Sequence, residues 1–472
     1  MAGTALKPAA KLVQYLEASP TPYHAVHNAV KRLEASGFTR LSERDAWELK
    51  PNGRYFATRN QSSIIAFTLP KSFKPGNAHG FAIVGAHTDS CNFKLRPISK
   101  RKKPADSNYM AIGKFGGGLW HTWLDRDLGI AGRVITASPD GTYTPHLVHL
   151  NKPLVRIPTV AIHLDRGQNE KFFYNQETGM QAILGLIQDQ VSSSGNTVNA
   201  NAMDIKANHH SRVLELVAEQ LKANGVKDAS VDTIHDFELS LFDIQAPTLG
   251  GANEEFIFSA RLDNLFSSFC AVEGLVEALE GLNDVPEGAI PCISLFDNEE
   301  IGSTSAYGAE SNFLEAIMQR VVGDPSRFDQ AVANSYLLST DMGHALHPAP
   351  DHANKHQAEH KPLMNLGPAI KTNAKIRYAS TAPTTLILRK IAESAGVPLQ
   401  EFEVRNDMAC GSTIGPLISK MGLRTVDIGC VQLSMHSIRE TGGAEDVGML
   451  IRLFKQFFKD FAKVDKSVIL DD

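Results

Sequence analysis

Hydrophobic and polar positions follow two different periods in the first part of the chain. Apolar residues at helical spacing predict one helix over residues 6–18 and a second helix that Gly37 ends. Strand-like runs follow at 54–58 and 63–69, and residues 81–86 form an apolar run too short for a helix. A continuous apolar run of this length is typical of a strand buried on both faces. The pattern therefore predicts the beginning of an α/β domain.

The second half of the chain shows a regular alternation of strand-like and helix-like segments. Strands are predicted at 255–260, 289–296, 335–339, 401–404 and 425–428, and helices at 265–282, 312–322, 385–395 and 444–463. Strands separated by helices favour a mostly parallel or mixed sheet covered by helices on both faces. The predicted fold class is α/β, with a mixed central sheet.

The middle of the chain has a different character. Short β-rich segments at 133–137, 143–150, 159–164 and 238–244 are joined by turns, and residues 192–208 are rich in Ser, Gly and Asn, as a mobile loop would be. We interpret residues 92–251 as a β-rich domain inserted into a discontinuous α/β domain formed by 1–91 and 252–472.

Composition narrows the class of protein without identifying it. The 472 residues are 43% hydrophobic and carry a net charge of -5, so bulk charge gives no reason to expect nucleic-acid or membrane partners. Five scattered cysteines do not form a disulfide framework, and no apolar run approaches the length of a membrane span. These features predict a soluble intracellular protein.

Acidic and histidine residues follow the predicted strands closely. They are His87, Asp89, Asp263, Glu299, Glu300, Asp341 and His436. In an open α/β sheet, ligands bind beyond the carboxyl ends of the strands, so residues far apart in sequence are expected to converge there.

The chemistry of this set favours a metal centre. Imidazole nitrogens and carboxylate oxygens together suit Zn²⁺, with Mn²⁺ or Co²⁺ as alternatives. Five ligands are too many for one open catalytic zinc and fit two ions that share a bridge. We predict that Asp263 bridges the ions, with His87 and Asp341 on one and Glu300 and His436 on the other. Two such ions generate a hydroxide nucleophile from water.

Two further carboxylates have predicted supporting roles. Asp89 is placed to orient the imidazole of His87, and Glu299 is a candidate general base beside a metal ligand. Each residue has an ordinary structural explanation when taken alone. Asp263 before a helix is typical of an N-cap, and paired acids usually form a solvated face. Their joint placement at strand ends favours the metal centre.

Five motifs in order resemble those of a known family. They are Gly85–Ser90 (GAHTDS), Arg261–Asn264 (RLDN), Asp297–Ser303 (DNEEIGS), Ser339–His344 (STDMGH) and Met435–Ser437 (MHS). The chain resembles the M18 metallopeptidases nearly from end to end, including the segments GGGLW at 116–120 and DRDL at 125–128 within the insertion.

The resemblance implies more than the residues alone do. It implies a zinc exopeptidase-like fold, two Zn²⁺ ions per subunit and removal of N-terminal Asp or Glu from peptides. It also implies that the insertion is a dimerisation domain and that the chain forms a tetrahedral homododecamer. The expected location is the cytoplasm, and the resemblance adds the vacuole as an alternative. Substrate would be held by the residues that match His163, His344, Lys371 and Tyr378.

Two other functions remain open from the sequence. The same metals would serve an aminopeptidase of broader or neutral specificity, or a deacylase. A non-catalytic assembly or cargo protein with a vestigial site is the alternative from another class. Without the family, Lys371 has the pattern of a solvated lysine, so acidic specificity depends on the resemblance.

Overall fold

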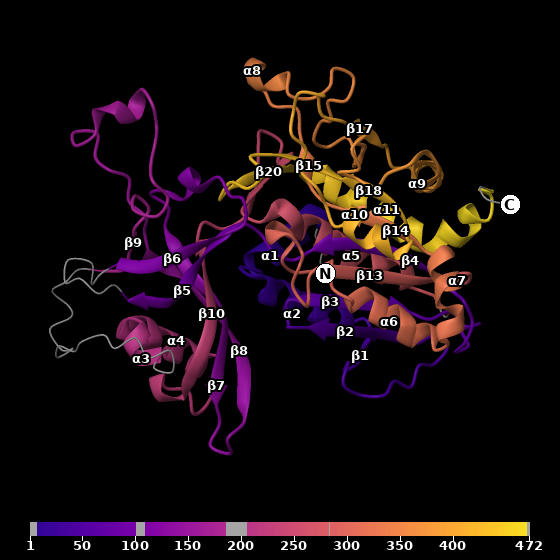
Figure 1. The fold of residues 1–472 in the computed structure, drawn as a ribbon, viewed down its shortest axis with the longest axis horizontal. Helices are drawn as coiled ribbons and strands as arrows, with labels where there is room; N and C mark the ends of the chain where they lie inside the picture. The colour runs from indigo at the N-terminus through magenta and orange to yellow at the C-terminus, as the bar shows by residue number, and fades with distance from the viewer. Residues whose placement is uncertain (1–6, 101–108, 186–204, 283, 470–472) are drawn as a thin grey trace, which may run out of the picture. The chain divides into compact units, whose positions relative to one another are not determined.

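A computed structural model describes residues 7–100, 109–185, 205–282 and 284–469 (Figure 1). The chain divides into two compact units. The first unit comprises Met1–Ser90, Pro247–Met435 and Arg439–Asp472, and the second comprises Cys91–Ala246 and His436–Ile438.

The first unit is built on a sheet of nine strands. Their order across the sheet is β1 (Thr39–Arg40), β2 (Arg54–Arg59), β3 (Ser63–Thr68), β13 (Ala289–Phe296), β4 (Gly80–His87), β14 (Tyr336–Thr340), β18 (Arg424–Gly429), β16 (Ala369–Lys371) and β17 (Gln400–Phe402). Strands β13, β4, β14 and β18 run parallel at its centre, whereas β3 and β16 pair antiparallel with β13 and β18. This arrangement confirms the predicted mixed sheet.

Alternation along β4 assigns its side chains to two hydrophobic layers. Val84 and its neighbours two residues away pack with helices α1 (Pro8–Glu17), α2 (Pro22–Glu34), α5 (Leu262–Leu279), α9 (Ala382–Ala395) and α11 (Ala444–Asp465). Ile83 packs on the other face, with α6 (Phe313–Val322), α7 (Phe328–Ala333) and α10 (Gly415–Ile418). Because both faces are covered, β4 is buried along its whole length, as its apolar run predicted.

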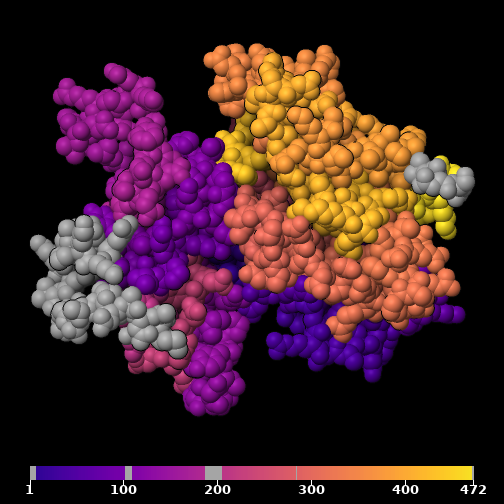
Figure 2. All heavy atoms as spheres, viewed as in Figure 1, coloured from indigo at the N-terminus to yellow at the C-terminus, as the bar shows by residue number. Residues whose placement is uncertain are grey.

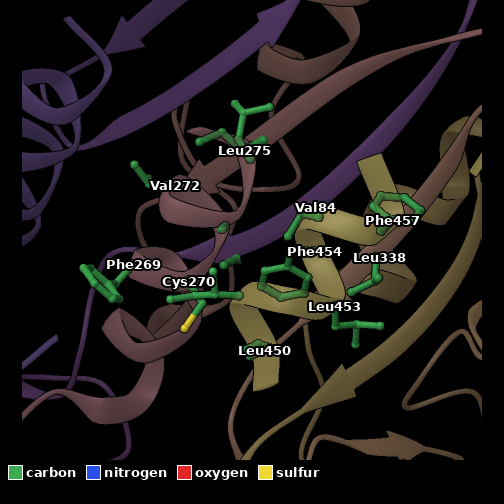
Figure 3. Close-up of a cluster of buried hydrophobic side chains, with 14 of the residues drawn as sticks. Val84, Phe269, Cys270, Val272, Leu275, Leu338, Leu450, Leu453, Phe454 and Phe457 are labelled. Atoms are coloured by element: carbon green, nitrogen blue, oxygen red, sulfur yellow. The ribbon is translucent and has the colours of Figure 1, made fainter. Parts of the chain in front are cut away.

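Helices α5 and α11 pack against each other in the layer that contains Val84. Their side chains share a cluster with Val84 of β4 and Leu338 of β14 (Figure 3). Gly274 lies in close contact with α11, because a Cβ atom built there would stand 2.6 Å from Cβ of Phe454. The missing side chain at Gly274 therefore allows this close approach.

A smaller sheet lies in the same unit. Its five strands are ordered β11 (Thr248–Gly250), β12 (Phe256–Ser259), β20 (Glu440–Gly443), β19 (Val431–Leu433) and β15 (Gly343–His344). The strand predicted at 255–260 is β12, so it belongs to this sheet and not to the central one. Hydrophobic patterning marks a strand but carries no information about which sheet the strand joins.

The second unit holds a sheet of six strands. Their order is β8 (Tyr143–Val155), β7 (Leu128–Ala137), β10 (Ile234–Asp243), β5 (Asn92–Lys100), β6 (Tyr109–Phe115) and β9 (Ala182–Ile183), and every pair is antiparallel. Helix α4 (Ser211–Ala223) buries Val213, Val217 and Leu221 in the core of this unit.

For the middle of the chain, one prediction is wrong, one helix was not predicted, and one predicted loop falls partly outside the described residues. Residues 159–164 are exposed and form no strand, and residues 162–164 form a turn. Helix α4 was not predicted, although its apolar residues follow helical spacing. Of the loop predicted at 192–208, residues 192–204 lie outside the described residues and Ile205–Asn208 form the short helix α3.

Segments from the second half of the chain, orange to yellow, make up much of the face of the first unit seen in Figure 2. None of the helices in the described ranges is both long enough and apolar enough to cross a membrane.

The contact between α5 and α11 gives a test of packing. We expect Gly274→Ala to lower the free energy of unfolding by about 1–3 kcal/mol, because the new methyl group forces two packed helices apart. Gly448→Ala is the matched control in α11, since its Cβ atom would make ordinary contacts at 3.5 and 3.7 Å. This control should be stabilised by roughly 0.5–1 kcal/mol through helix propensity. Urea denaturation measures both, and equal effects would contradict the packing argument.

Candidate metal centre

His87 ends β4 and is the residue around which the site gathers. Its side chain is buried, and its Nε2 atom lies 3.3 Å from Oδ1 of Asp263 and 3.3 Å from Oδ1 of Asp341. These three ligand atoms all lie within 4.8 Å of one another. One imidazole and two carboxylates at this spacing form a donor set suited to a divalent ion such as zinc.

Asp263 reaches the cluster from the start of α5, at a point where the backbone is not helical. Its φ and ψ are -83° and 106°, and the following Asn264 is also outside helical geometry. The preceding Arg261 is left-handed at φ 62°, and its guanidinium donates to the main-chain oxygens of Leu16 and Ser19. The irregular turn directs the carboxylate of Asp263 toward His87.

Asp341 follows β14, and the main chain holds it in place. Its amide donates to Ile428 of β18 at 2.9 Å, and Asn264 Nδ2 donates to the carbonyl of Thr340 at 2.8 Å. Oδ1 of Asp341 is buried and accepts no hydrogen bond from the residues that the structure describes. A buried carboxylate oxygen in this condition is costly unless a cation binds it, so the site fits a metal.

Asp89 has a role that sequence reasoning only partly anticipated. Oδ1 of Asp89 lies 3.4 Å from Nδ1 of His87, which also lies 3.1 Å from the main-chain oxygen of Asp89. In addition, the two carboxylate oxygens accept the amides of Glu299 and Glu300, each at 3.1 Å. One buried carboxylate thus contacts both the imidazole and the turn that carries the acidic pair.

Glu299 and Glu300 lie in a short 3₁₀ turn, η6 (Glu299–Ile301), after β13. Oε2 of Glu299 is 3.8 Å from Nε2 of His87, which places this carboxylate at the edge of the cluster. Burial, opposed by His87, raises the pKa of Glu299 to about 8. Burial lowers the pKa of His87, but the surrounding carboxylates outweigh it and raise this pKa well above the usual value.

His436 belongs to the second unit, in the segment His436–Ile438. Its backbone is left-handed at φ 64°, and its carbonyl accepts the amide of Leu119 at 2.8 Å. Nδ1 lies 3.3 Å from the carbonyl oxygen of Gly117. A proton shared with that carbonyl makes Nε2 the basic nitrogen, which is the form that binds metals.

The four residues predicted to hold substrate occupy different settings. Lys371 ends β16 and is buried, and its Nζ donates to the carbonyl of Met342 at 2.8 Å. Tyr378 is buried with its ring 5.5 Å from that Nζ, and burial raises the pKa of its hydroxyl. His344 is exposed at the end of β15, in the first unit, while His163 is exposed in a turn of the second unit.

Several supporting residues were missed by sequence reasoning. Ser90 Oγ donates to the carbonyl of Asp263 at 2.6 Å, and Ser268 Oγ donates to the carbonyl of His87 at 2.6 Å. Glu440 accepts the amide of Asp263 at 3.1 Å. Only position inside the motifs GAHTDS and near MHS singles out Ser90 and Glu440, because a serine or glutamate has no distinctive pattern of its own.

Comparison with known proteins gives a consistent result. A family model described as aminopeptidase I zinc metalloprotease (M18) matches residues 15–458. The aspartyl aminopeptidase of Aspergillus oryzae is 43% identical, with 98% of each chain covered. Aspartyl aminopeptidase 4 of Saccharomyces cerevisiae is 45% identical, over 98% of this chain and 96% of the relative.

Solved structures agree with these relatives. A chain in the cryo-EM structure of the Ape4 and Nbr1 complex superposes with a TM-score of 0.92 at 41% identity, covering 98% of this chain and 88% of that one. The structure of the S. cerevisiae mApe1 dodecamer superposes with a TM-score of 0.83 at 28% identity, covering 98% and 99%.

Asp89 provides a test of how the centre is organised. We expect Asp89→Asn to weaken zinc binding by about 10–100-fold, because an amide nitrogen would face one of the two main-chain N–H groups. Asp446→Asn is the matched control, since Asp446 also accepts two amides, those of Asn365 and Gly367. Competition with a fluorescent chelator measures both affinities. Equal losses in the two variants would contradict a specific role for Asp89.

Proposed function

Because the chain belongs to the M18 family of zinc metallopeptidases, we propose that it removes Asp or Glu from the amino termini of peptides. The observation that carries this specificity is the buried ammonium of Lys371, which donates to the residue directly after the metal-site Asp341. The family supports the chemistry, and the lysine supports the choice of substrate.

The proposed centre would hold two zinc ions on five side chains. His87 and Asp341 would hold one ion and Glu300 and His436 the other, with the carboxylate of Asp263 shared between them. Support comes from the geometry of the His87, Asp263 and Asp341 cluster and from the donor chemistry of the other two residues. Zinc at such a centre supplies Lewis-acid polarisation of the scissile carbonyl and a water of lowered pKa.

The remaining steps belong to the side chains of the chain itself. Glu299 lies 3.8 Å from His87, at the edge of the cluster, and is proposed to take a proton from the attacking water. The same carboxyl then returns this proton to the leaving amine. Asp89 holds the amide of Glu299 and so fixes the base relative to His87.

Lys371 explains how an acidic substrate side chain would be recognised. Within the part of the chain that the structure describes, its Nζ forms no ion pair. Lys371 interacts electrostatically with the carboxylate of Asp427. That carboxylate already accepts hydrogen bonds from the amide of Ala379 and the hydroxyl of Thr413, each at 2.6 Å. A buried cation of this kind is stabilised by a charged hydrogen bond, which the carboxylate of a substrate Asp or Glu provides.

Tyr378, His344 and His163 are proposed to complete substrate binding. The ring of Tyr378 lies beside Lys371, which supports its place in the same pocket. His344 follows Asp341 by three residues and packs against Phe402 at 5.9 Å between ring centroids. His163 lies in the second unit, so its role rests on family resemblance.

The chain is proposed to self-associate as a homododecamer. A relative at 28% identity is described as a dodecamer. The second unit exposes apolar side chains between residues 160 and 173, of which Leu164 is 81% exposed and Phe173 is 72% exposed. Apolar side chains gathered on one exposed segment commonly mark protein interfaces. The tetrahedral arrangement, the dimerisation role of the insertion and a cytoplasmic or vacuolar location stay predictions.

Glu299 and Glu300 are neighbours with different proposed roles, and this allows a paired test. We expect Glu299→Gln to lower kcat by about 10²–10⁴-fold with zinc content unchanged, because only the proton transfer is lost. Glu300→Gln should lower zinc content as well as activity. Stopped-flow or steady-state kinetics combined with metal analysis separates the two. A Glu299→Gln enzyme with kcat within about tenfold of the parent contradicts the role of Glu299.

Substrate preference tests the role of Lys371. We expect Lys371→Met to lower kcat/KM on Asp- and Glu-anilides by roughly 10–150-fold, the value of one charged hydrogen bond of about 1.5–3 kcal/mol. Leu-anilide should be affected far less. Lys375→Met, four residues away and exposed, is the control. Equal losses on acidic and apolar substrates would assign Lys371 a structural role instead.

The wild-type chain separates the alternatives. A preference for Leu-anilide over Asp-anilide would favour a neutral aminopeptidase, and acylated amino acids as better substrates would favour a deacylase. Failure of carefully purified protein to bind zinc would favour a non-catalytic assembly protein.

A further inference from the structure

We propose that Glu440 positions the bridging residue Asp263 and thereby sets the zinc affinity of the centre. This inference rests on the proposed function, because it takes Asp263 to be a metal ligand. It concerns a residue that makes no contact with substrate and is not itself proposed to bind metal.

The argument begins with the backbone of Asp263. Residues Asp263 and Asn264 are not helical although they lie within the bounds of α5. The amide of Asp263 is therefore not hydrogen bonded in the helical pattern, yet the residue is 5% exposed. A buried amide needs an acceptor, and one left without it costs free energy comparable to a lost hydrogen bond.

Glu440 supplies that acceptor. Its Oε2 atom lies 3.1 Å from the amide nitrogen of Asp263, and a carboxylate is a stronger acceptor than a carbonyl. In the next peptide unit, Ser90 Oγ donates to the carbonyl of Asp263 at 2.6 Å. Both main-chain polar groups of Asp263 are thus held by side chains from other segments.

Glu440 is itself fixed. It begins β20, where it pairs with Ser259 of β12, and its side chain is 3% exposed. Its second oxygen, Oε1, accepts from Nε2 of Gln432 on the adjacent β19 at 3.3 Å. The carboxylate therefore spans two strands of the five-stranded sheet and the start of α5.

This geometry predicts a specific effect of removing the charge without changing the shape. Gln at position 440 places a donor toward either the amide of Asp263 or Nε2 of Gln432, and one hydrogen bond is then lost. The loss is avoided only if the amide of Gln432 turns over to offer its Oε1, which accepts no hydrogen bond from the described residues. Leu at position 440 removes the acceptor in every orientation. Asp263 then has more than one orientation, and a bridging carboxylate that is not held in place binds metal more weakly.

The test compares zinc affinity across five proteins by competition with a chelator of known affinity. We expect Glu440→Gln to bind zinc about 10–100-fold more weakly than wild type, with activity recovered at saturating zinc. Glu273→Gln is the matched control, because Glu273 is a buried glutamate of α5 that pairs with Arg32 away from the cluster. It should lower the melting temperature and leave zinc affinity unchanged.

Asp263→Asn distinguishes the failure of this inference from the failure of the proposed function. If wild type binds zinc and Asp263→Asn does not, unchanged affinity in both Glu440→Gln and Glu440→Leu overturns the role of Glu440 alone. If wild type binds no zinc, both proposals fail. Glu440→Leu serves as a second variant in case Gln432 reorients to accommodate Gln, and loss of melting temperature without loss of zinc affinity in both variants would also overturn the inference.

Discussion

Two buried carboxylates, those of Asp263 and Asp341, lie 3.3 Å from the same imidazole nitrogen of His87, and the site depends on this concentration of negative charge. Like charges at this spacing in a poorly solvated place repel strongly and are stable only with a compensating cation. The pKa values of His87 and Glu299 are raised for a related reason, because a proton on either side chain also offsets the negative charge of the neighbouring carboxylates. A divalent ion meets the requirement without a proton, which is why this arrangement suits metal chemistry.

Holding such groups together before a cation arrives requires a rigid surrounding. The nine-stranded sheet provides it, because hydrophobic layers cover both faces and bury β4 from end to end. Directly beyond the strands, regular hydrogen bonding stops and side chains take over. Ser268 holds the carbonyl of His87, and Asp89 holds two amides of the acidic turn. Left-handed residues such as Arg261 and Asn298 occur at the same turns, where unusual backbone geometry aims the functional groups.

The sequence predicted much of this arrangement because strands and polar residues follow simple rules. The apolar run at 81–86 predicted a buried strand, which is most of β4. His87 follows this run directly and predicted a site at the carboxyl ends of the strands. Sequence reasoning failed where the outcome depends on long-range partners. Nothing in residues 255–260 indicates that β12 joins a second sheet, and nothing in Glu440 indicates that its partner is an amide 177 positions earlier. Helix α4 was overlooked for a different reason: it lies within a segment whose other pieces are strands.

In the proposed function, a single backbone segment links the cluster of His87, Asp263 and Asp341 to the choice of substrate. Asp341 contributes a carboxylate to the cluster, and Met342, the next residue, offers its carbonyl to the ammonium of Lys371. The amides of Asp341 and Gly343 donate to the carbonyls of Ile428 and Cys430, so the backbone is hydrogen bonded on both sides of Met342. An acidic amino-terminal residue has its α-amine, its side-chain carboxylate and its scissile carbonyl within a few bonds of one another. In the proposed function, a fixed spacing between the cluster and the ammonium of Lys371 would let both ends of that residue bind together. A substrate without the carboxylate would leave the buried ammonium without an anionic partner, which would cost binding free energy.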